Sequence, residues 1–227
     1  MSQAESREAK KKILVPVIAV IGVALVIFLS NRPAENSNGV QVIESEEQYN
    51  YALSKVSEST LTAVSKFNMG LELDQADKDA AMQGAKTYDS MNAFRPDMSA
   101  GYFGAGLLYY LANDTDSAES RLNQAIADAP QPANLKAGTK DKLDGVIADS
   151  HHMLSLIAFD RHDYVTAGKE AERALQILST RESYYVARAQ ALIQLSMLKE
   201  AKNDIKAALK LNPNSLPATR LEKFLNH

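Results

Sequence analysis

Hydrophobic residues recur every three or four positions along most of this chain, which is the spacing of a buried stripe on an α-helix. A capping-box sequence at Ser45–Gln48 marks the start of one such helix, which we expect to end near Asp74. A second should run from about Ala80 to Ala93. The stripe predicted for the first helix consists of Tyr49, Leu53, Val56, Val64, Phe67 and Leu71. Nothing after Ser45 alternates as a strand would, so the pattern predicts an all-α fold.

Small residues then repeat with a period of 34 residues. Ala167 and Ala201 are 34 positions apart, as are Ala174 and Ala208. A fixed period of this length indicates a stack of helix pairs, in which small residues allow antiparallel helices to approach closely and a proline ends each pair. The predicted repeat-packing residues are Gly106, Ala118, Ala125, Pro130, Ala167, Ala174, Ala189, Ala201, Ala208 and Pro213.

These residues resemble the tetratricopeptide repeat (TPR), a helix–turn–helix unit of 34 residues. The resemblance covers residues 99–132, 148–181 and 182–215, and a degenerate unit lies at about 63–98 with Gly84 where alanine is expected. Ser155 and Ala189 replace a glycine of the family's pattern, and His151 replaces an aromatic residue. The resemblance implies an α-solenoid of about three to four repeats with a C-terminal capping helix.

The spacing is interrupted once. Ala118 and Ala167 are separated by one period plus fifteen residues, close to 131–145, and we assign an insertion to 133–147. Thr139 is placed to cap a first helix longer than its neighbours. The insertion is either a tolerated surface segment or a projecting contact element. Residues 216–227 form the predicted capping helix, with Leu221, Phe224 and Leu225 on one face.

The N-terminus has a different character. Residues 13–30 contain no charge, which is enough for one transmembrane helix, and the basic segment 1–12 before them favours a cytoplasmic N-terminus. A cleaved secretory signal is the alternative to this signal anchor. Residues 31–44 read as a linker, and 45–98 as the long helix with the degenerate repeat. Either way, the rest of the chain is expected outside the cytoplasm, in the periplasm if the cell is bacterial.

Composition and motifs give no support for catalysis. The net charge of −3 disfavours a nucleic-acid partner, and the absence of cysteine removes disulfides and thiolate sites. His151 and His152 are adjacent and point about 100° apart on a helix, so they do not share a metal simply. The acidic runs at 74–79 and 114–116 read as helix caps. We expect no enzyme activity, metal, cofactor or small-molecule substrate.

The resemblance to TPR proteins also implies a binding groove on the first helices of the pairs. The positions carried over to this chain are Phe103, Leu107, Tyr110, Leu111, His152, Leu156, Phe159, Gln190, Ile193 and Gln194. The lysine and asparagine pattern with which some members clamp a C-terminal carboxylate is absent. An aromatic and aliphatic groove flanked by acids suits an extended or helical protein segment.

Two functions remain open from the sequence. The first is a membrane-anchored protein–protein interaction scaffold that acts in assembly, maturation or quality control of membrane or exported proteins. The alternative is a permanent accessory subunit of a large membrane complex, whose extramembrane surface the solenoid would cover.

Overall fold

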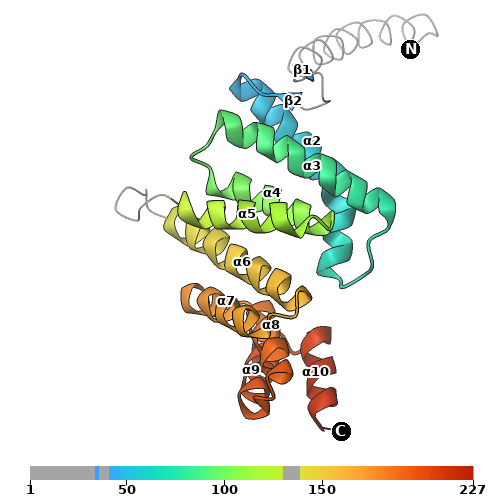
Figure 1. Ribbon diagram of the computed structural model, residues 1–227, viewed down its shortest axis with the longest axis vertical. Helices are drawn as coiled ribbons and strands as arrows, with labels where there is room; N and C mark the ends of the chain where they lie inside the picture. The colour runs from blue at the N-terminus through green and yellow to red at the C-terminus, as the bar shows by residue number, and fades with distance from the viewer. Residues whose placement is uncertain (1–33, 36–40, 130–138, 227) are drawn as a thin grey trace, which may run out of the picture.

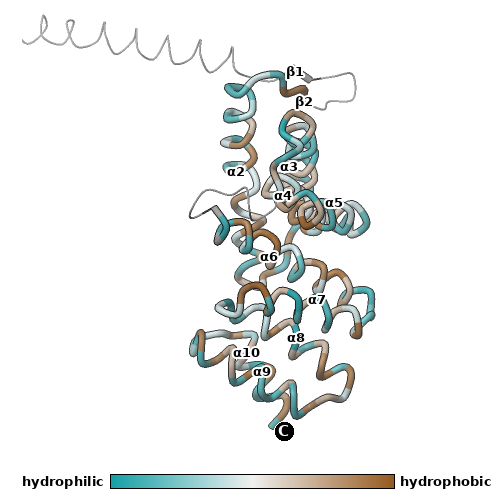
Figure 2. Tube along the Cα trace, turned by 90° about the vertical axis from the view of Figure 1, so that its left-hand side faces the viewer, coloured by the Kyte–Doolittle hydropathy of each residue, from teal (hydrophilic) through white to brown (hydrophobic). Residues whose placement is uncertain are grey.

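A computed structural model describes residues 34–35, 41–129 and 139–226 of the chain. In this part, antiparallel helices stack one after another into an elongated molecule (Figure 1). The helices are α2 (Glu46–Asn68), α3 (Gln75–Phe94), α4 (Ser99–Leu111), α5 (Thr115–Ala127), α6 (Thr139–Asp160), α7 (Tyr164–Ile177), α8 (Glu182–Gln194), α9 (Leu198–Leu211) and α10 (Leu216–Asn226). Hydrophobic and hydrophilic stretches both occur along the stack (Figure 2), and the helices bury one side against their neighbours.

Helices contact mainly their neighbours in sequence, and the first helices of successive pairs also contact each other. The pairs are α2–α3, α4–α5, α6–α7 and α8–α9, with α10 packed against α9 and α8. All of the alanines predicted to pack between helices are fully buried: Ala118, Ala125, Ala167, Ala174, Ala189, Ala201 and Ala208. Pro213 lies exposed between α9 and α10, and Pro130 lies outside the described residues.

Close approach explains the residue types at the helix crossings. A Cβ added to Gly106 would lie 2.7 Å from Cγ of Leu122, so α4 and α5 could not come as near with a larger residue. Ser155 occupies the same place in the α6–α7 pair, and its hydroxyl donates a 2.8 Å hydrogen bond to the carbonyl of Ala167. The serine therefore fits the crossing because its polar atom has a partner in the facing helix.

The first pair differs from its prediction. Helix α2 ends at Asn68, not near Asp74, because Gly70 adopts a left-handed conformation with φ of +66° and turns the chain away. Leu53 and Leu71, expected in the buried stripe, are exposed. The residues of α2 that are buried are Tyr49, Ala52, Val56, Thr60 and Ala63, which are mostly small because α3 packs closely against them.

Helix α3 begins five residues earlier than expected, at Gln75. Asp74 accepts a hydrogen bond from the Asp77 amide at 2.9 Å, and Asp77 accepts one from the Asp74 amide at 3.0 Å. This reciprocal capping box fixes the start of the helix. In α3, a Cβ on Gly84 would lie 2.7 Å from Cγ2 of Thr60, so the alanine expected there would collide with α2.

The segment before α2, predicted as an unstructured linker, contains a short antiparallel ladder. Strand β1 (Ala34–Glu35) pairs with β2 (Gln41–Val42) in the register Ala34 to Val42 and Glu35 to Gln41. Ile43 follows directly and is buried beside Tyr49 and Met91, which fastens the segment to α2 and α3. The predicted transmembrane segment 13–30 lies outside the described residues. None of the helices that the structure describes is long and apolar enough to span a membrane.

Helix α6 agrees with its prediction, whereas α10 differs from its prediction at one residue. Helix α6 has 22 residues against 13 or 14 in α4, α5, α7, α8 and α9, so the first helix of this pair is longer, as expected. In α10, Leu221 and Leu225 pack on the cluster formed by Ala189, Ala201 and Ile205. Phe224, predicted on the same face, is exposed, because it lies on the side of Leu221 away from Leu225, about 100° around the helix from Leu225.

Candidate partner-binding groove

The first helices of the pairs form one continuous side of the stack, because α2 contacts α4, α4 contacts α6, α6 contacts α8 and α8 contacts α10. A hollow of about 630 Å³ opens on this side between the α2–α3 turn and α10. Its floor includes His152 and Leu156 of α6 with Val186, Ala187 and Gln190 of α8. The volume lies within the range of about 300–1,000 Å³ that ligand sites have.

The two walls of this hollow come from elements far apart in the sequence. One is the α2–α3 turn, with Met69 and Leu71, and the other is the start of α10, with Leu216 and Pro217. Met69, Leu71 and Leu216 are largely exposed. Large apolar side chains that face each other across a hollow lose contact with water when a ligand enters, which favours an apolar occupant.

A second hollow, of about 310 Å³, adjoins the first. It is bordered by Phe67 of α2, Phe103 and Leu107 of α4, and Asp149 and Met153 of α6. The two hollows share Asn68, His152 and Ser183 as lining residues, so they meet at His152. We call the two together the groove.

His152 is the most unusual residue of the groove. Its Nδ1 atom is buried and has no hydrogen-bond partner among the described residues. The ring lies 5.1 Å from that of Tyr184, centroid to centroid. Burial, and to a lesser degree the positive charge of Arg181, lowers the pKa of His152 from its ordinary value of 6.5 to about 4. The imidazole is therefore neutral at physiological pH, and its ring lines the groove while Nδ1 is covered by the surrounding residues.

The polar groups around His152 hold one another in place. The Tyr184 hydroxyl donates a hydrogen bond to Asp149, and the pKa of Tyr184 is raised by burial and by this carboxylate. Arg181 lies 3.4 Å from the same carboxylate. At the other end, the Asn212 amide donates to Glu182 at 3.1 Å. The acids that line the groove are thus partnered, while the Arg220 guanidinium forms no ion pair within the described ranges.

Five of the ten residues predicted for the groove line it: Phe103, Leu107, His152, Leu156 and Gln190. The other five do not. The Tyr110 hydroxyl donates a 2.8 Å hydrogen bond to Asp160, and its ring contacts Phe67 edge-on at 5.9 Å. Leu111 is buried in the core. Phe159 packs against Tyr164, Ile193 packs in the cluster with Ala201 and Ile205, and Gln194 is exposed at the end of α8.

Sequence reasoning missed the groove walls, namely Met69, Leu71, Leu216, Pro217 and Arg220. A repeat pattern assigns positions on the helices and says nothing about a turn or a cap that closes over them. A usable signal was present, because Met69 and Leu71 flank Gly70, a residue type that ends helices, and apolar residues in such a turn have no partner within their own repeat.

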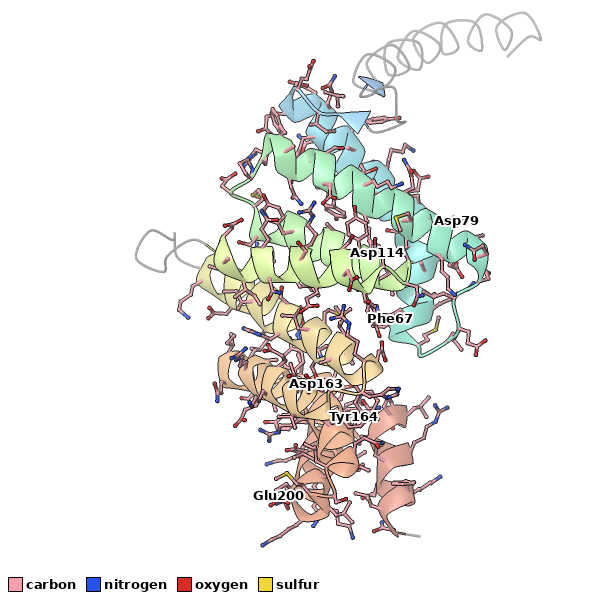
Figure 3. All side chains as sticks on the ribbon, viewed as in Figure 1. Phe67, Asp79, Asp114, Asp163, Tyr164 and Glu200 are labelled. Atoms are coloured by element: carbon pink, nitrogen blue, oxygen red, sulfur yellow. The ribbon has the colours of Figure 1, made fainter. Side chains whose placement is uncertain are left out.

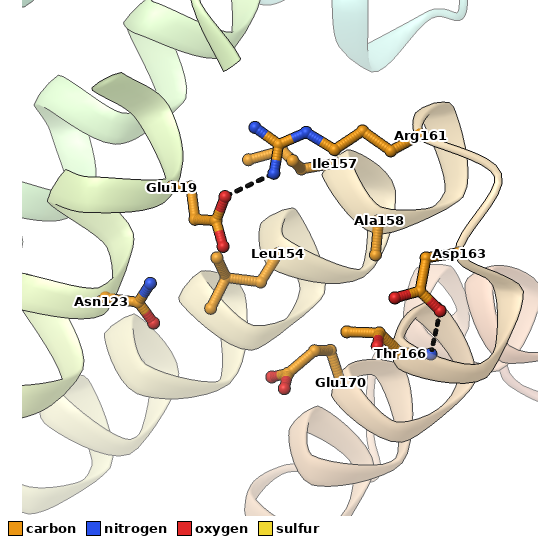
Figure 4. A pocket seen from close by; sticks show the side chains of 9 residues that line it. All are labelled: Glu119, Asn123, Leu154, Ile157, Ala158, Arg161, Asp163, Thr166 and Glu170. Atoms are coloured by element: carbon orange, nitrogen blue, oxygen red, sulfur yellow. Dashed lines mark hydrogen bonds and ion pairs between the residues drawn. The ribbon is translucent and has the colours of Figure 1, made fainter. Parts of the chain in front are cut away.

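Elsewhere, a smaller hollow of about 150 Å³ lies between α5, α6 and α7 (Figure 4). Arg161 crosses its rim to Glu119 and, at 2.6 Å, to Asp116. Asp163 accepts a 3.0 Å hydrogen bond from the Thr166 amide and caps α7. The contacts of Arg161 join successive repeats. Within the described ranges, no group of three or more histidine and acidic side chains is arranged to hold a metal.

Comparison with known proteins rests on structure, since no protein-family model and no curated protein matches this chain. The C-terminal TPR-containing domain of an FK506-binding protein of Plasmodium falciparum is 19% identical, with a TM-score of 0.51 over 56% of this chain and 85% of that one. YrrB, a TPR protein with an unusual peptide-binding site, is 15% identical, with a TM-score of 0.50 over 78% and 81%. MamA gives a TM-score of 0.48 at 16% identity, over 73% of this chain and 79% of MamA.

At these identities the first two similarities concern the fold alone. They agree with a stack of antiparallel helix pairs. The chain therefore has a tetratricopeptide-repeat fold.

Proposed function

We propose that this chain is a membrane-anchored scaffold that binds a protein segment in its groove. The observation that supports this most directly is the groove itself, with its exposed apolar walls. These side chains do not stabilise the chain alone, because exposing large apolar groups to water costs free energy. A bound partner that covers them would offset this cost.

The lining fits a peptide better than a small molecule. Side-chain amides of Asn68, Gln190, Asn212 and Asn214 surround the apolar walls, and amides both donate and accept hydrogen bonds as a peptide backbone requires. The open form of the hollow suits an extended or helical segment laid across first helices. Peptide binding by YrrB, which has the same fold, makes this use of the fold plausible for our chain.

The proposed anchor is the uncharged segment 13–30, whose basic flank, Arg7 with Lys10–Lys12, favours residues 31–227 on the extracytoplasmic side. Anchoring raises the local concentration of the groove near membrane-bound or newly exported proteins. This chain would then act in the assembly, maturation or quality control of such proteins.

The groove is tested by removing its exposed apolar walls in the full-length chain. We expect the triple variant Met69→Ser/Leu71→Ser/Leu216→Ser to lose most partner binding while its melting temperature stays near that of the wild type, because all three side chains are exposed. A matched control is Leu61→Ser/Val165→Ser/Phe224→Ser, which removes exposed apolar side chains outside the groove. Equal loss in both variants, or loss in neither, would contradict a groove-bound partner.

The role is tested by extracting the full-length chain from its native membrane in a mild neutral detergent. Several immature proteins recovered in substoichiometric amounts support an assembly or quality-control factor. A large complex of constant stoichiometry would instead identify a permanent accessory subunit. Protease protection in closed native membranes checks the anchor: residues beyond 31 should be cleaved only from the extracytoplasmic side.

A further inference from the structure

The turns within the last three helix pairs have the same backbone geometry but different chemistry. Each contains one residue in the left-handed conformation, with φ of 67° at Asn113, 61° at His162 and 62° at Ser196. In the first two turns the next residue is an aspartate, Asp114 or Asp163 (Figure 3), whose carboxylate accepts a hydrogen bond from the helix that follows. In the third turn that residue is Met197, which makes no such bond.

The third turn is also the most apolar of the three. Leu195, Met197 and Leu198 are 36%, 43% and 47% exposed. The corresponding residues are Ala112, Asp114 and Thr115 in the first turn, and Arg161, Asp163 and Tyr164 in the second. The repeat fold therefore does not require the apolar residues, and replacing the aspartate forfeits a cap that stabilises the start of a helix. The turn lacks the aspartate cap and exposes apolar side chains, and neither feature stabilises the fold. Such a departure from the local rules of helix capping points to a functional surface.

Helix α9 continues this surface with a stripe of lysines. Lys199, Lys202, Lys206 and Lys210 follow at steps of three and four residues, which places them within an arc of about 80° and along roughly 16 Å of helix. All four are exposed, and none forms an ion pair among the residues that the structure describes. Of the two acids on α9, Asp204 is instead bound to Arg188 of α8.

The earlier second helices show that this stripe is peculiar to α9. The same positions on α5 hold Asp116, Glu119, Asn123 and Ala127. On α7 they hold Val165, Gly168, Glu172 and Gln176. An ordinary solvated helix face mixes both signs of charge, whereas four unpaired lysines in line attract a complementary row of carboxylates.

We propose that the apolar turn Leu195–Leu198 and the four lysines of α9 form a second docking surface, the α9 surface, for an acidic amphipathic segment of another protein. Apolar side chains of that segment would cover the turn, and carboxylates at helical spacing would pair with the lysines. The α9 surface is separate from the groove, because no residue of α9 lines either hollow. One chain can therefore hold two partners at once.

A lipid surface is the other anionic ligand to consider. The α9 surface lies at the end of the stack farthest from β1, as Figure 1 and the position of Glu200 in Figure 3 show. Residues 13–30 precede β1 in the chain, so the anchor proposed above would attach at the end of the stack opposite α9. The choice of a protein partner in preference to lipid rests on this anchor.

The experiment uses the full-length chain reconstituted in phosphatidylcholine nanodiscs, free of detergent, and three probes. The first is a fluorescent 16-residue synthetic helical peptide with two leucines in its first turn and glutamates at three- and four-residue steps along one face. The second is the same peptide with glutamine for each glutamate. The third is vesicles of phosphatidylglycerol and phosphatidylcholine. Fluorescence anisotropy reports peptide binding at low and at high salt, and vesicle flotation reports lipid binding.

We expect the glutamate peptide to bind the wild type and to bind the Lys202→Gln/Lys206→Gln variant at least tenfold more weakly. High salt should weaken it similarly, because exposed charge pairs are screened. The matched control, Lys86→Gln/Lys169→Gln, removes two exposed lysines of α3 and α7 and should bind as the wild type does.

Met197→Asp separates function from folding. It restores the aspartate that caps α5 and α7, so the melting temperature should rise while peptide binding falls. The proposal is overturned by no binding of the glutamate peptide, by equal binding of the glutamine peptide, or by unchanged binding to the stripe variant. It is also overturned if the vesicles bind and lose binding in the stripe variant while the peptide does not, since the surface would then be a lipid site.

Discussion

Gly106 of α4 faces Leu122 of α5 at a distance that leaves no room for a side chain, since an added Cβ would lie 2.7 Å from Leu122 Cγ and 3.2 Å from the Ala118 carbonyl oxygen. We therefore expect Gly106→Ala to lower the free energy of unfolding by about 1–2 kcal/mol. The strain of overpacking, ~1–3 kcal/mol, exceeds the gain of up to ~1 kcal/mol in helix propensity. Urea unfolding of the two proteins measures the difference.

Gly145 of α6 provides the control for that change. It also lies inside a helix, but an added Cβ meets no atom within 4 Å. Gly145→Ala should consequently stabilise the chain, by up to about 1 kcal/mol, because only the propensity gain remains. If both substitutions shift stability in the same direction, the close approach of α4 and α5 is not what selects glycine at position 106.

Arg188 and Asp204 form the best-buried ion pair that joins α8 to α9. Two hydrogen bonds of 2.8 and 2.7 Å connect the guanidinium to the carboxylate, and Asp204 is buried. Arg188→Met should cost about 2–3 kcal/mol, below the ~3–5 kcal/mol of a fully buried pair because Arg188 keeps some contact with solvent. The double variant Arg188→Met/Asp204→Leu should recover most of the loss in thermal unfolding, since no unpaired charge is left. A double variant as unstable as the single one would show that packing, and not charge, is lost.

His152 should make stability depend on pH. Its pKa of about 4 in the folded chain lies below the ordinary value of 6.5, so between these pH values the unfolded chain binds a proton that the folded chain does not. The free energy of unfolding should therefore fall as the pH drops from about 6.5 towards 4, with a contribution of about 3 kcal/mol at pH 4. In His152→Phe, which keeps a ring beside Tyr184, this contribution should vanish.

Denaturant unfolding at a series of pH values between 4 and 7.5 measures the effect as the difference between the two proteins. The difference cancels the contributions of carboxylates, which both proteins share. Gln190→Ala, which changes a lining residue of the groove that does not titrate, serves as the control and should keep the dependence of the wild type. Parallel curves for the wild type and His152→Phe would mean that His152 is not buried as described.

Tyr184 links α8 to α6 through its hydroxyl, which donates to Asp149, while its ring is fully buried. Tyr184→Phe should lower the free energy of unfolding by about 1 kcal/mol, because Asp149 keeps Arg181 beside it and can regain water. Tyr185→Phe, the same change one residue along α8, should have a smaller effect. Thermal unfolding of both variants tests whether the Asp149 contact matters to the stack.

The sequence predicted those parts of the fold that follow from local or periodic rules. Ala118, Ala167 and Ala201 mark each crossing because only small residues permit it, and the cap at Asp114 follows from side-chain chemistry at helix starts. The end of α2 was wrong because Leu71 keeps the helical spacing although Gly70 has already turned the chain. Periodicity alone does not register a single left-handed residue.

The sequence predicted the groove residues that lie on the first helices, but not those on the turn and the capping helix. Phe103, His152 and Gln190 lie on first helices, where the resemblance to other repeats assigns them. Leu216 lies on the capping helix, and whether it faces the groove depends on how all the preceding helices are turned relative to one another. That sum of rotations is a property of the whole stack, and no short segment encodes it.

The walls of the groove also set its mechanics. The α2–α3 turn and α10 belong to the first and last parts of the array, and the elements between them join the two walls in series. The distance between the two walls thus depends on the curvature of the whole array. Small changes of angle at each helix interface add up to a large change in this distance. A bound segment that draws the two walls together must bend the whole array. Residues at distant helix interfaces therefore affect the affinity for the ligand, as do the residues that contact it.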